Sequence, residues 1–284
     1  MNELNSGEIR QFLERALEED RACEDITVKL TVPDNLLAKA FIEARQDGVV
    51  AGIDICRQVF VLADEKLEVA IDCHDGAHVK SGDVVARIFG SAQGILRAER
   101  TALNILGWMS GIATLTAQFT KRVEGTRAII CDTRKTTPTL RLLSKYAVRT
   151  GGGQNHRMNL ADGVLIKDNH INILRSSGKS LEEIVFIARE KAPKGVEIEV
   201  EVTSYEEALE VVRSKPDIIL LDNMSLAEMK KTVRQIGAQV KLEASGGITL
   251  ENVAEIAATG VDYISIGALT HSAKNMDFSL EISG

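Results

Sequence analysis

Apolar positions near the amino terminus recur every three or four residues, which predicts an amphipathic helix. These positions are Ile9, Phe12, Leu13, Ala16 and Leu17. Asn5 and Glu8 stand three residues apart just before them and resemble a capping box, so we expect the helix to begin there. Short strand-like runs follow at 38–44, 67–73 and 84–89, and a largely buried helix is predicted around 97–111. The first hundred residues therefore mix helix and strand.

The pattern changes near residue 112, where apolar β-branched runs begin to alternate with amphipathic helices. The runs lie at 128–131, 164–166, 196–202, 218–221, 240–242 and 263–266. Helices are predicted to begin near Leu181, Ser204, Ser225 and Leu250, the last of them after a cap at Thr249. This alternation predicts βα units and a parallel sheet. Because no GxGxxG motif opens any of the helices, a barrel is favoured over a dinucleotide-binding fold.

Polar residues follow five of the six predicted strands of this second region. They are Asp132–Lys135, Lys167–His170, Asp222-Asn223, Glu243 with Ser245–Gly247, and Gly267–Thr270. Barrel enzymes build their sites at the carboxyl ends of the strands, and their last loops commonly bind a phosphate through backbone N–H groups. A single cluster of this kind is compatible with a plain loop. Their recurrence predicts an active site.

Composition places the chain among soluble globular proteins. Of 284 residues, 44% are hydrophobic and 26% charged, and no apolar run approaches the ~20 residues of a membrane span. The acidic amino terminus does not resemble a signal peptide, and the four cysteines form no CxxC pair, so a cytoplasmic location is expected. A net charge of −7 and an aromatic content of 4% argue against nucleic acid as a partner.

The charge is unevenly distributed. Between 127 and 167 there are eight Lys or Arg against two Asp, a balance of +6, which leaves −13 for the rest of the chain. Arg134, Lys135, His156 and Arg157 are expected on loops, with Lys167 at a strand end. Convergent guanidinium groups bind carboxylates and phosphates, so this basic segment predicts a small polyanionic ligand. The alternative is a solvated cationic face.

Carboxylates at the same end of the predicted barrel need a cation, a metal or a sugar hydroxyl as partner. Glu201 and Asp222 are the candidates. Alternation places Glu197, Glu199 and Glu201 on one face of a strand, and the sequence leaves open which of them reaches a ligand. No histidine pair has zinc-ligand spacing, so no protein metal site is predicted, and Mg²⁺ brought in by a phosphate is the more natural ion.

Seven ordered motifs carry a resemblance to a known family. They are DTRKTTP at 132–138, KYAVRTGGGQNHRMNL at 145–160, LIKDNH at 165–170, EVEV at 199–202, LLDN at 220–223, EASGGI at 243–248 and IGALTHS at 266–272. Together with AERTALN at 98–104 they resemble the quinolinate phosphoribosyltransferases. One departure is Thr139, where the family usually has glycine, and it puts the geometry of that loop in question.

The resemblance implies an N-terminal α/β sandwich domain, 1–111, followed by an incomplete TIM-like α/β barrel, 112–272, that carries the active site. The tail 273–284 is then expected to pack back on the first domain. The resemblance also implies a homodimer, with assembly beyond the dimer left open, in which Arg100 of the AERT motif completes the partner's site.

The implied reaction transfers phosphoribosyl from 5-phosphoribosyl-1-pyrophosphate (PRPP), bound with Mg²⁺, to quinolinate. Its products are nicotinate mononucleotide, pyrophosphate and CO₂. The residues assigned to the quinolinate carboxylates are Arg134, His156, Arg157 and Arg100, with Lys135 and Thr133. Glu201 and Asp222 are assigned to the ribose and the Mg²⁺-pyrophosphate. The 5′-phosphate is assigned to Ser245, Gly246, Gly247 and Gly267. Lys167 is expected where the two substrates meet and is assigned to neither.

Three alternatives remain open from the sequence. A relative with the same scaffold could act on another aromatic acid, as proteins of molybdate-transport gene clusters do. Lys167 could serve as a Schiff-base nucleophile in an aldolase-like barrel. The chain could also be a catalytically silent nucleotide sensor, although retention of every charged site residue argues against that alternative.

Overall fold

The computed structural model describes residues 7–283, which form two compact units. Within these residues the first unit comprises the chain up to Ala117, Leu142–Gly151 and the chain from Ser272; the second comprises Gln118–Arg141 and Gly152–His271. The helical segment Leu142–Gly151 thus lies with the first unit, although it falls within the domain predicted from residue 112 onward. Close packing explains its position, because a Cβ atom on Gly151 would lie 2.3 Å from the carbonyl oxygen of Ala113.

The first unit is built on an antiparallel sheet with strand order β12-β1-β5-β3. Its elements are α1 (Gly7–Glu19), the 3-10 helix η2 (Ala22–Glu24), α2 (Ile26–Thr31), β1 (Leu37–Ala44), β2 (Gly48–Val49), α3 (Ile53–Ala63), β3 (Glu68–Ile71), β4 (His78–Val79), β5 (Val84–Ser91), most of α4 (Ala92–Arg122), nearly all of α5 (Arg141–Thr150) and β12 (Phe278–Ser283). The predicted strands at 38–44, 67–73 and 84–89 are confirmed as β1, β3 and β5. The predicted first helix is confirmed as α1, whereas its expected cap, Asn5, lies outside the described residues.

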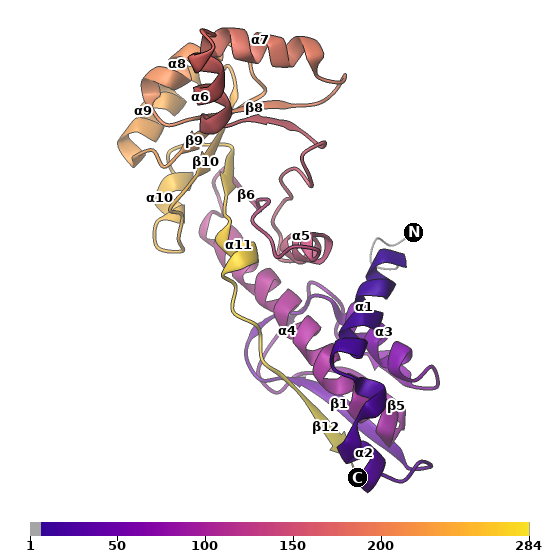
Figure 1. Ribbon diagram of the computed structural model, residues 1–284. Coiled ribbons are helices and arrows are strands. Elements are labelled where there is room, and N and C mark those ends of the chain that lie inside the picture. The colour runs from indigo at the N-terminus through magenta and orange to yellow at the C-terminus, as the bar shows by residue number, and fades with distance from the viewer. Residues whose placement is uncertain (1–6, 284) are drawn as a thin grey trace. The chain divides into compact units, whose positions relative to one another are not determined.

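The last strand, β12, pairs antiparallel with β1, with Ala40 opposite Ile282 (Figure 1). The carboxyl-terminal strand therefore forms an edge of the first unit's sheet. The buried face of this unit is apolar, with Ile42, Phe60 and Ile88 at most 2% exposed. Burial of such side chains is the main source of its stability.

The second unit contains six parallel strands in the order β6-β11-β10-β9-β8-β7. Its elements are β6 (Ile129–Cys131), β7 (Val164–Ile166), α6 (Asp168–Ser176), α7 (Leu181–Lys191), β8 (Ile198–Val202), α8 (Tyr205–Val211), the 3-10 helix η3 (Val212–Ser214), β9 (Ile218–Asp222), α9 (Leu226–Ile236), β10 (Lys241–Ser245), α10 (Val253–Ala257), β11 (Tyr263–Ser265) and α11 (Ala268–His271). All six predicted strands and the helices near 181, 204 and 225 are confirmed. The fold is mixed α/β, with a sheet domain followed by a parallel-sheet α/β domain.

Two features of the second unit differ from expectation. The helix predicted from Leu250 begins at Val253, because the side chain of Asn252 bonds the carbonyl of Gly247 and the N–H of Thr249 and holds the intervening residues in a turn. The polar residues after β7 open helix α6, which was not predicted, with Lys167 at its N-cap position. Among the described residues, no helix combines the length and apolar character required to cross a membrane.

Candidate active site

The carboxyl ends of the parallel strands surround a cavity of about 260 Å³ in the second unit. Its walls combine cationic and anionic side chains with a few apolar ones: Thr133, Arg134, Lys135, His156, Arg157, Leu165, Lys167, Glu201, Leu220, Asp222, Glu243, Ser245 and Ser265. Most of the residues predicted from the sequence therefore meet in one place. Parallel strands bring this about because all their carboxyl ends lie at the same edge of the sheet.

The loop carrying His156 and Arg157 reaches this edge by pairing beside β6. Gln154 donates its N–H to the carbonyl of Ile130 at 2.8 Å, and Asp132 donates its N–H to the carbonyl of Gln154 at 3.1 Å. Asp132 also accepts a hydrogen bond from the His156 N–H at 2.9 Å. The glycine-rich segment thus behaves as an extension of the sheet and delivers its basic residues to the cavity.

Two guanidinium groups, those of Arg134 and Arg157, line the cavity together. Burial lowers the pKa of Arg157, and the neighbouring charge of Arg134 lowers that pKa further, partly offset by Glu199. Arg157 donates one hydrogen bond, 3.0 Å, to the carbonyl of Gly163, whereas the buried Nε of Arg134 has no hydrogen-bond partner among the described residues. Crowded cations and an orphaned donor mark a place for an anion.

Lys167 and Glu201 form an ion pair across adjacent strands, with Nζ 3.0 Å from Oε2. The Glu201 side chain is only 10% exposed, and that of Lys167 is 45% exposed. The pair places one cation and one anion at the cavity wall, each able to exchange its partner for a ligand of the appropriate charge.

Asp222 ends β9 and faces the same cavity. One of its carboxylate oxygens, Oδ2, accepts a hydrogen bond of 2.7 Å from the side-chain amide of Asn223. Its neighbour across the sheet is Ser245, at the end of β10. Asn223 was named from the sequence among the polar residues that follow the strands, but no role was assigned to it.

The loop after β10 is shaped by two consecutive left-handed glycines, Gly246 (φ 90°) and Gly247 (φ 61°). Within the described part of the chain, no acceptor is bonded to the N–H groups of Gly246, Gly247 or Ile248. Successive unpaired N–H groups in such a turn form a concave anion site. Gly267 lies close by at the start of the next loop, where a Cβ atom would come within 3.0 Å of the Lys135 side chain.

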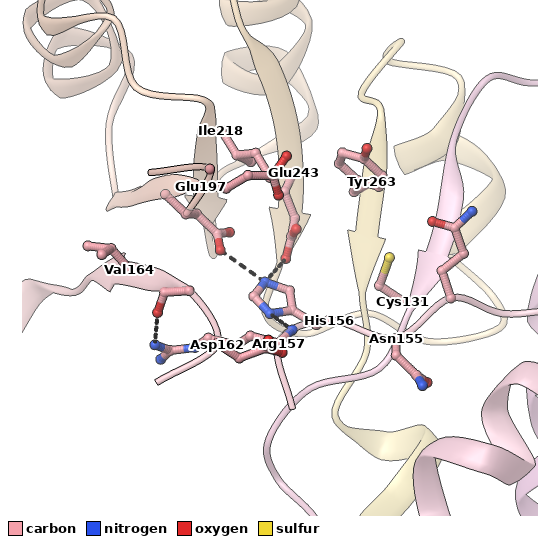
Figure 2. Close-up of a pocket in the computed structure, with 14 residues that line it drawn as sticks. Cys131, Asn155, His156, Arg157, Asp162, Val164, Glu197, Ile218, Glu243 and Tyr263 are labelled. Atoms are coloured by element: carbon pink, nitrogen blue, oxygen red, sulfur yellow. Dashed lines mark hydrogen bonds and ion pairs between the residues drawn. The ribbon is translucent and has the colours of Figure 1, made fainter. Parts of the chain in front are cut away.

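His156 forms a cluster with two buried carboxylates, those of Glu199 and Glu243; Figure 2 shows His156 and Glu243. His156 Nε2 lies 3.0 Å from a Glu199 oxygen and 3.6 Å from a Glu243 oxygen. Burial raises the pKa of Glu243 to about 7, with the Glu199 charge adding to the effect and His156 opposing it. A buried carboxyl group close to a second carboxylate, as Glu243 is, is stabilised in its protonated form.

The hydrogen bonds of His156 argue against a metal ion in this cluster. The N–H of Arg157 donates to Nδ1 at 2.8 Å, so Nδ1 carries no proton and Nε2 must carry it in neutral imidazole. A metal would need that same Nε2 unprotonated, with Nδ1 as the donor. Both ring nitrogens thus have protein partners, and direct contact between His156 and a ligand requires one of these bonds to break.

A second cavity, of about 450 Å³, lies on the other side of His156 and is shown in Figure 2. Glu197, Val164 and Tyr263 line it near the amino ends of their strands. The three glutamates of the predicted strand are thereby separated: Glu197, just before β8, and Glu199 line this second cavity, and Glu201 lines the first.

Arg100 lies in the first unit, on α4. Its side chain is 64% exposed, and its guanidinium is 3.8 Å from the carboxylate of Glu99.

Glu199 and Glu243 are two residues to which the sequence analysis assigned no part in the site. Charged residues in the middle of otherwise apolar strands were the signal that could have revealed both.

Comparison with known proteins gives a consistent result over nearly the whole chain. The family model described as quinolinate phosphoribosyl transferase, N-terminal domain, matches residues 25–110, and the corresponding C-terminal domain model matches residues 112–281. The nicotinate-nucleotide pyrophosphorylase [carboxylating] of Mycobacterium leprae is 43% identical over 279 residues, covering 96% of each chain. The probable nicotinate-nucleotide pyrophosphorylase of Bacillus subtilis is 39% identical, covering 99% of this chain and 95% of the relative. The crystal structure of NadC from Streptococcus pyogenes superposes with a TM-score of 0.94 at 39% identity, covering 100% of this chain and 99% of that one.

Proposed function

The chain belongs to the quinolinate phosphoribosyltransferase family, and from that premise we propose that it transfers the phosphoribosyl group of PRPP to quinolinate. The products are nicotinate mononucleotide, pyrophosphate and CO₂, so the enzyme acts in the de novo biosynthesis of NAD. Quinolinate carries two adjacent carboxylates, and its recognition calls for more than one fixed cation.

The observation that carries this proposal is the pair of crowded guanidinium groups. Arg134 has a buried Nε without a partner, and the charge of Arg134 is one of the causes that lower the pKa of Arg157. A dianion placed between them relieves the repulsion and pairs the orphaned donor. Lys135 and Thr133 line the same cavity and complete its polar wall.

We assign the phosphosugar to the opposite wall of this cavity. Glu201 and Asp222 face the ribose and the pyrophosphate with its Mg²⁺, which enters as part of that substrate. Carboxylate oxygens at the ends of neighbouring strands suit both ribose hydroxyls and Mg²⁺. The N–H groups of the glycine loop, together with Ser245 and the region of Gly267, take the 5′-phosphate.

The main contribution of the protein to this reaction is to place charged groups around the reacting atoms. The pyridine nitrogen of quinolinate forms a bond to the anomeric carbon of the ribose while the bond from that carbon to pyrophosphate breaks. Glu201 and Asp222 stabilise the positive charge that develops on the sugar, and Lys167 stands where pyrophosphate and quinolinate meet. The resulting pyridinium ring accepts the electron pair released when the 2-carboxylate leaves as CO₂, and the ring carbon then takes a proton. Fixed geometry and exclusion of water supply the catalysis.

We also propose that the active unit is a homodimer in which Arg100 serves the partner's site. Arg100 sits exposed on the first unit, whereas the other assigned residues belong to the second. An exposed arginine is available to a second copy. It would add one more cation to the quinolinate carboxylates.

The direct test is product formation by the purified protein from quinolinate, PRPP and Mg²⁺, with nicotinate assayed in parallel. Nicotinate lacks the 2-carboxylate. Nicotinate mononucleotide and CO₂ formed from quinolinate alone would support the proposal. A folded, dimeric sample that gives no product would refute it and direct attention to other aromatic acids, screened by thermal shift.

A further inference from the structure

Asn223 connects two loops that the proposed function assigns to the phosphosugar. Its backbone N–H donates to the carbonyl of Ser245 at 2.9 Å, at the start of the glycine loop. Its side-chain amide donates to Oδ2 of Asp222 at 2.7 Å. One residue thus bonds the carboxylate at the end of β9 and the main chain at the end of β10.

The side chain of Asn223 lies directly over Gly246. A Cβ atom built on Gly246 would stand 2.2 Å from Oδ1 and 2.5 Å from Cγ of Asn223, far inside van der Waals contact. Any side chain at Gly246 would therefore displace Asn223. On the other side of the loop, Asn252 donates to the carbonyl of Gly247 at 2.9 Å. The glycine loop is held from both sides by asparagine amides.

The backbone at Asn223 is left-handed, with φ 53°. The connection from β9 to α9 is short, because Ser225 already caps the helix, and a left-handed residue makes the turn. Glycine would adopt this conformation without cost, whereas asparagine adopts it with some strain. The turn alone therefore does not require the side-chain amide of Asn223, which indicates that the amide has another role.

We propose that Asn223 is a positioning residue for the phosphoribosyl group: its amide orients the carboxylate of Asp222, and its seat against Gly246 sets the distance between that carboxylate and the glycine loop. This inference rests on the proposed function, since it takes Asp222 and the loop as the two ends of the phosphosugar site. Asn223 acts through Asp222 and Gly246 and need not touch the substrate.

The experiment replaces Asn223 with glycine and measures steady-state kinetics for both substrates together with the melting temperature. Asn223→Gly keeps the left-handed turn and removes only the amide. We expect kcat/KM for PRPP to fall about tenfold, the loss of one hydrogen bond to a charged group, while KM for quinolinate stays within about twofold of wild type. The melting temperature should equal or exceed that of wild type.

Two further variants separate strain from positioning. Lys215 is another left-handed residue of the second unit (φ 54°), located before the amino end of β9, so Lys215→Gly should raise the melting temperature and leave the kinetics unchanged. Asn223→Asp keeps the shape of the side chain but sets a second carboxylate beside Asp222, and it should weaken PRPP use more than Asn223→Gly does. Rates for Asn223→Gly equal to wild type, or equal losses for both substrates with a lower melting temperature, would overturn the inference.

A binding titration keeps this test separate from that of the reaction. PRPP with Mg²⁺ is titrated calorimetrically into wild type and Asn223→Gly. If wild type binds PRPP but makes no product from quinolinate, the proposed function fails alone, and about tenfold weaker binding by the variant still supports the positioning role. If wild type does not bind PRPP, both fail.

Discussion

Replacing Thr139 with glycine should make the protein more stable without changing its activity. Thr139 has a left-handed backbone, φ 68°, although it is β-branched and exposed. It stands where the family usually has glycine. The loop thus keeps a conformation that suits glycine, and in this conformation the Cβ atom of threonine is sterically strained. Its hydroxyl donates to the carbonyl of Pro138 at 2.6 Å, an exposed bond that contributes little net stability.

The size of the effect follows from two opposing terms. The left-handed conformation costs a residue with a Cβ about 1–2 kcal/mol. Removing this strain stabilises the folded protein, but glycine offsets about 0.4–1 kcal/mol of that stabilisation because it increases the conformational freedom of the unfolded chain. The net stabilisation is about 0.5–1 kcal/mol, and the melting temperature of a unit of this size should rise by about 1–4 °C. Thermal unfolding followed by circular dichroism measures the shift.

Thr137→Gly is the matched control two residues away, since Thr137 is exposed and is not among the left-handed residues. There, glycine only loosens the unfolded chain and should lower the melting temperature. Equal shifts for Thr137→Gly and Thr139→Gly would refute the reasoning from strain. Activity should be retained in Thr139→Gly, because Lys135 is anchored independently by bonds to the side chains of Thr133 and Thr270.

Three further predictions concern charge in the site. Arg157→Ala should raise KM for quinolinate and lower kcat/KM by about 1–3 kcal/mol in steady-state assays, and an unchanged kcat/KM would contradict its assignment. Arg100→Ala and Asp222→Asn should each be nearly inactive. When equal amounts of the two variants exchange subunits, half of the dimers are mixed and each mixed dimer holds one intact site, so the mixture should recover about a quarter of wild-type activity. No recovery would place Arg100 outside the partner's site. Since the pKa of Glu243 is raised to about 7 from 4.5, the folded protein keeps a proton that the unfolded chain releases, so stability falls as pH rises through this window. Urea unfolding of Glu243→Gln against wild type should show the variant gaining in relative stability from pH 4.5 to 7, and a constant difference would contradict the raised pKa.

The strands of the second unit were predictable because their sequences are apolar and β-branched. Ile219 and Leu221 on one face of β9 are fully buried and Leu220 on the other face is 5% exposed, as expected for a parallel strand covered on both faces. The predicted boundaries failed where polar residues continue a strand. β10 extends to Ser245 and includes Glu243, although the hydrophobic pattern ends at Leu242.

The place of α5 with the first unit and the connecting role of Asn223 were not predictable from local pattern. The segment Arg141–Thr150 is amphipathic, but its place with the first unit depends on contacts such as that of Gly151 with Ala113, which are remote in sequence. The bond from Asn223 to Ser245 likewise joins residues on different strands. Such relations arise from tertiary packing, for which a single sequence gives no periodic signal.

The alternating glutamates of β8 and of the residue just before it lie in three different environments. Glu201 lies at the carboxyl end and pairs with Lys167, Glu199 lies in the middle against His156, and Glu197 lines the second cavity. A buried carboxylate is costly unless its charge is compensated, and burial deepens from Glu201 to Glu199. The compensation therefore changes along the strand, from an exchangeable lysine at the substrate cavity to a fixed histidine below it. Lys167 is half-exposed and can be exchanged for a substrate without leaving an unpaired charge in the interior, and this supports our proposal that Glu201 is the glutamate that faces the substrate.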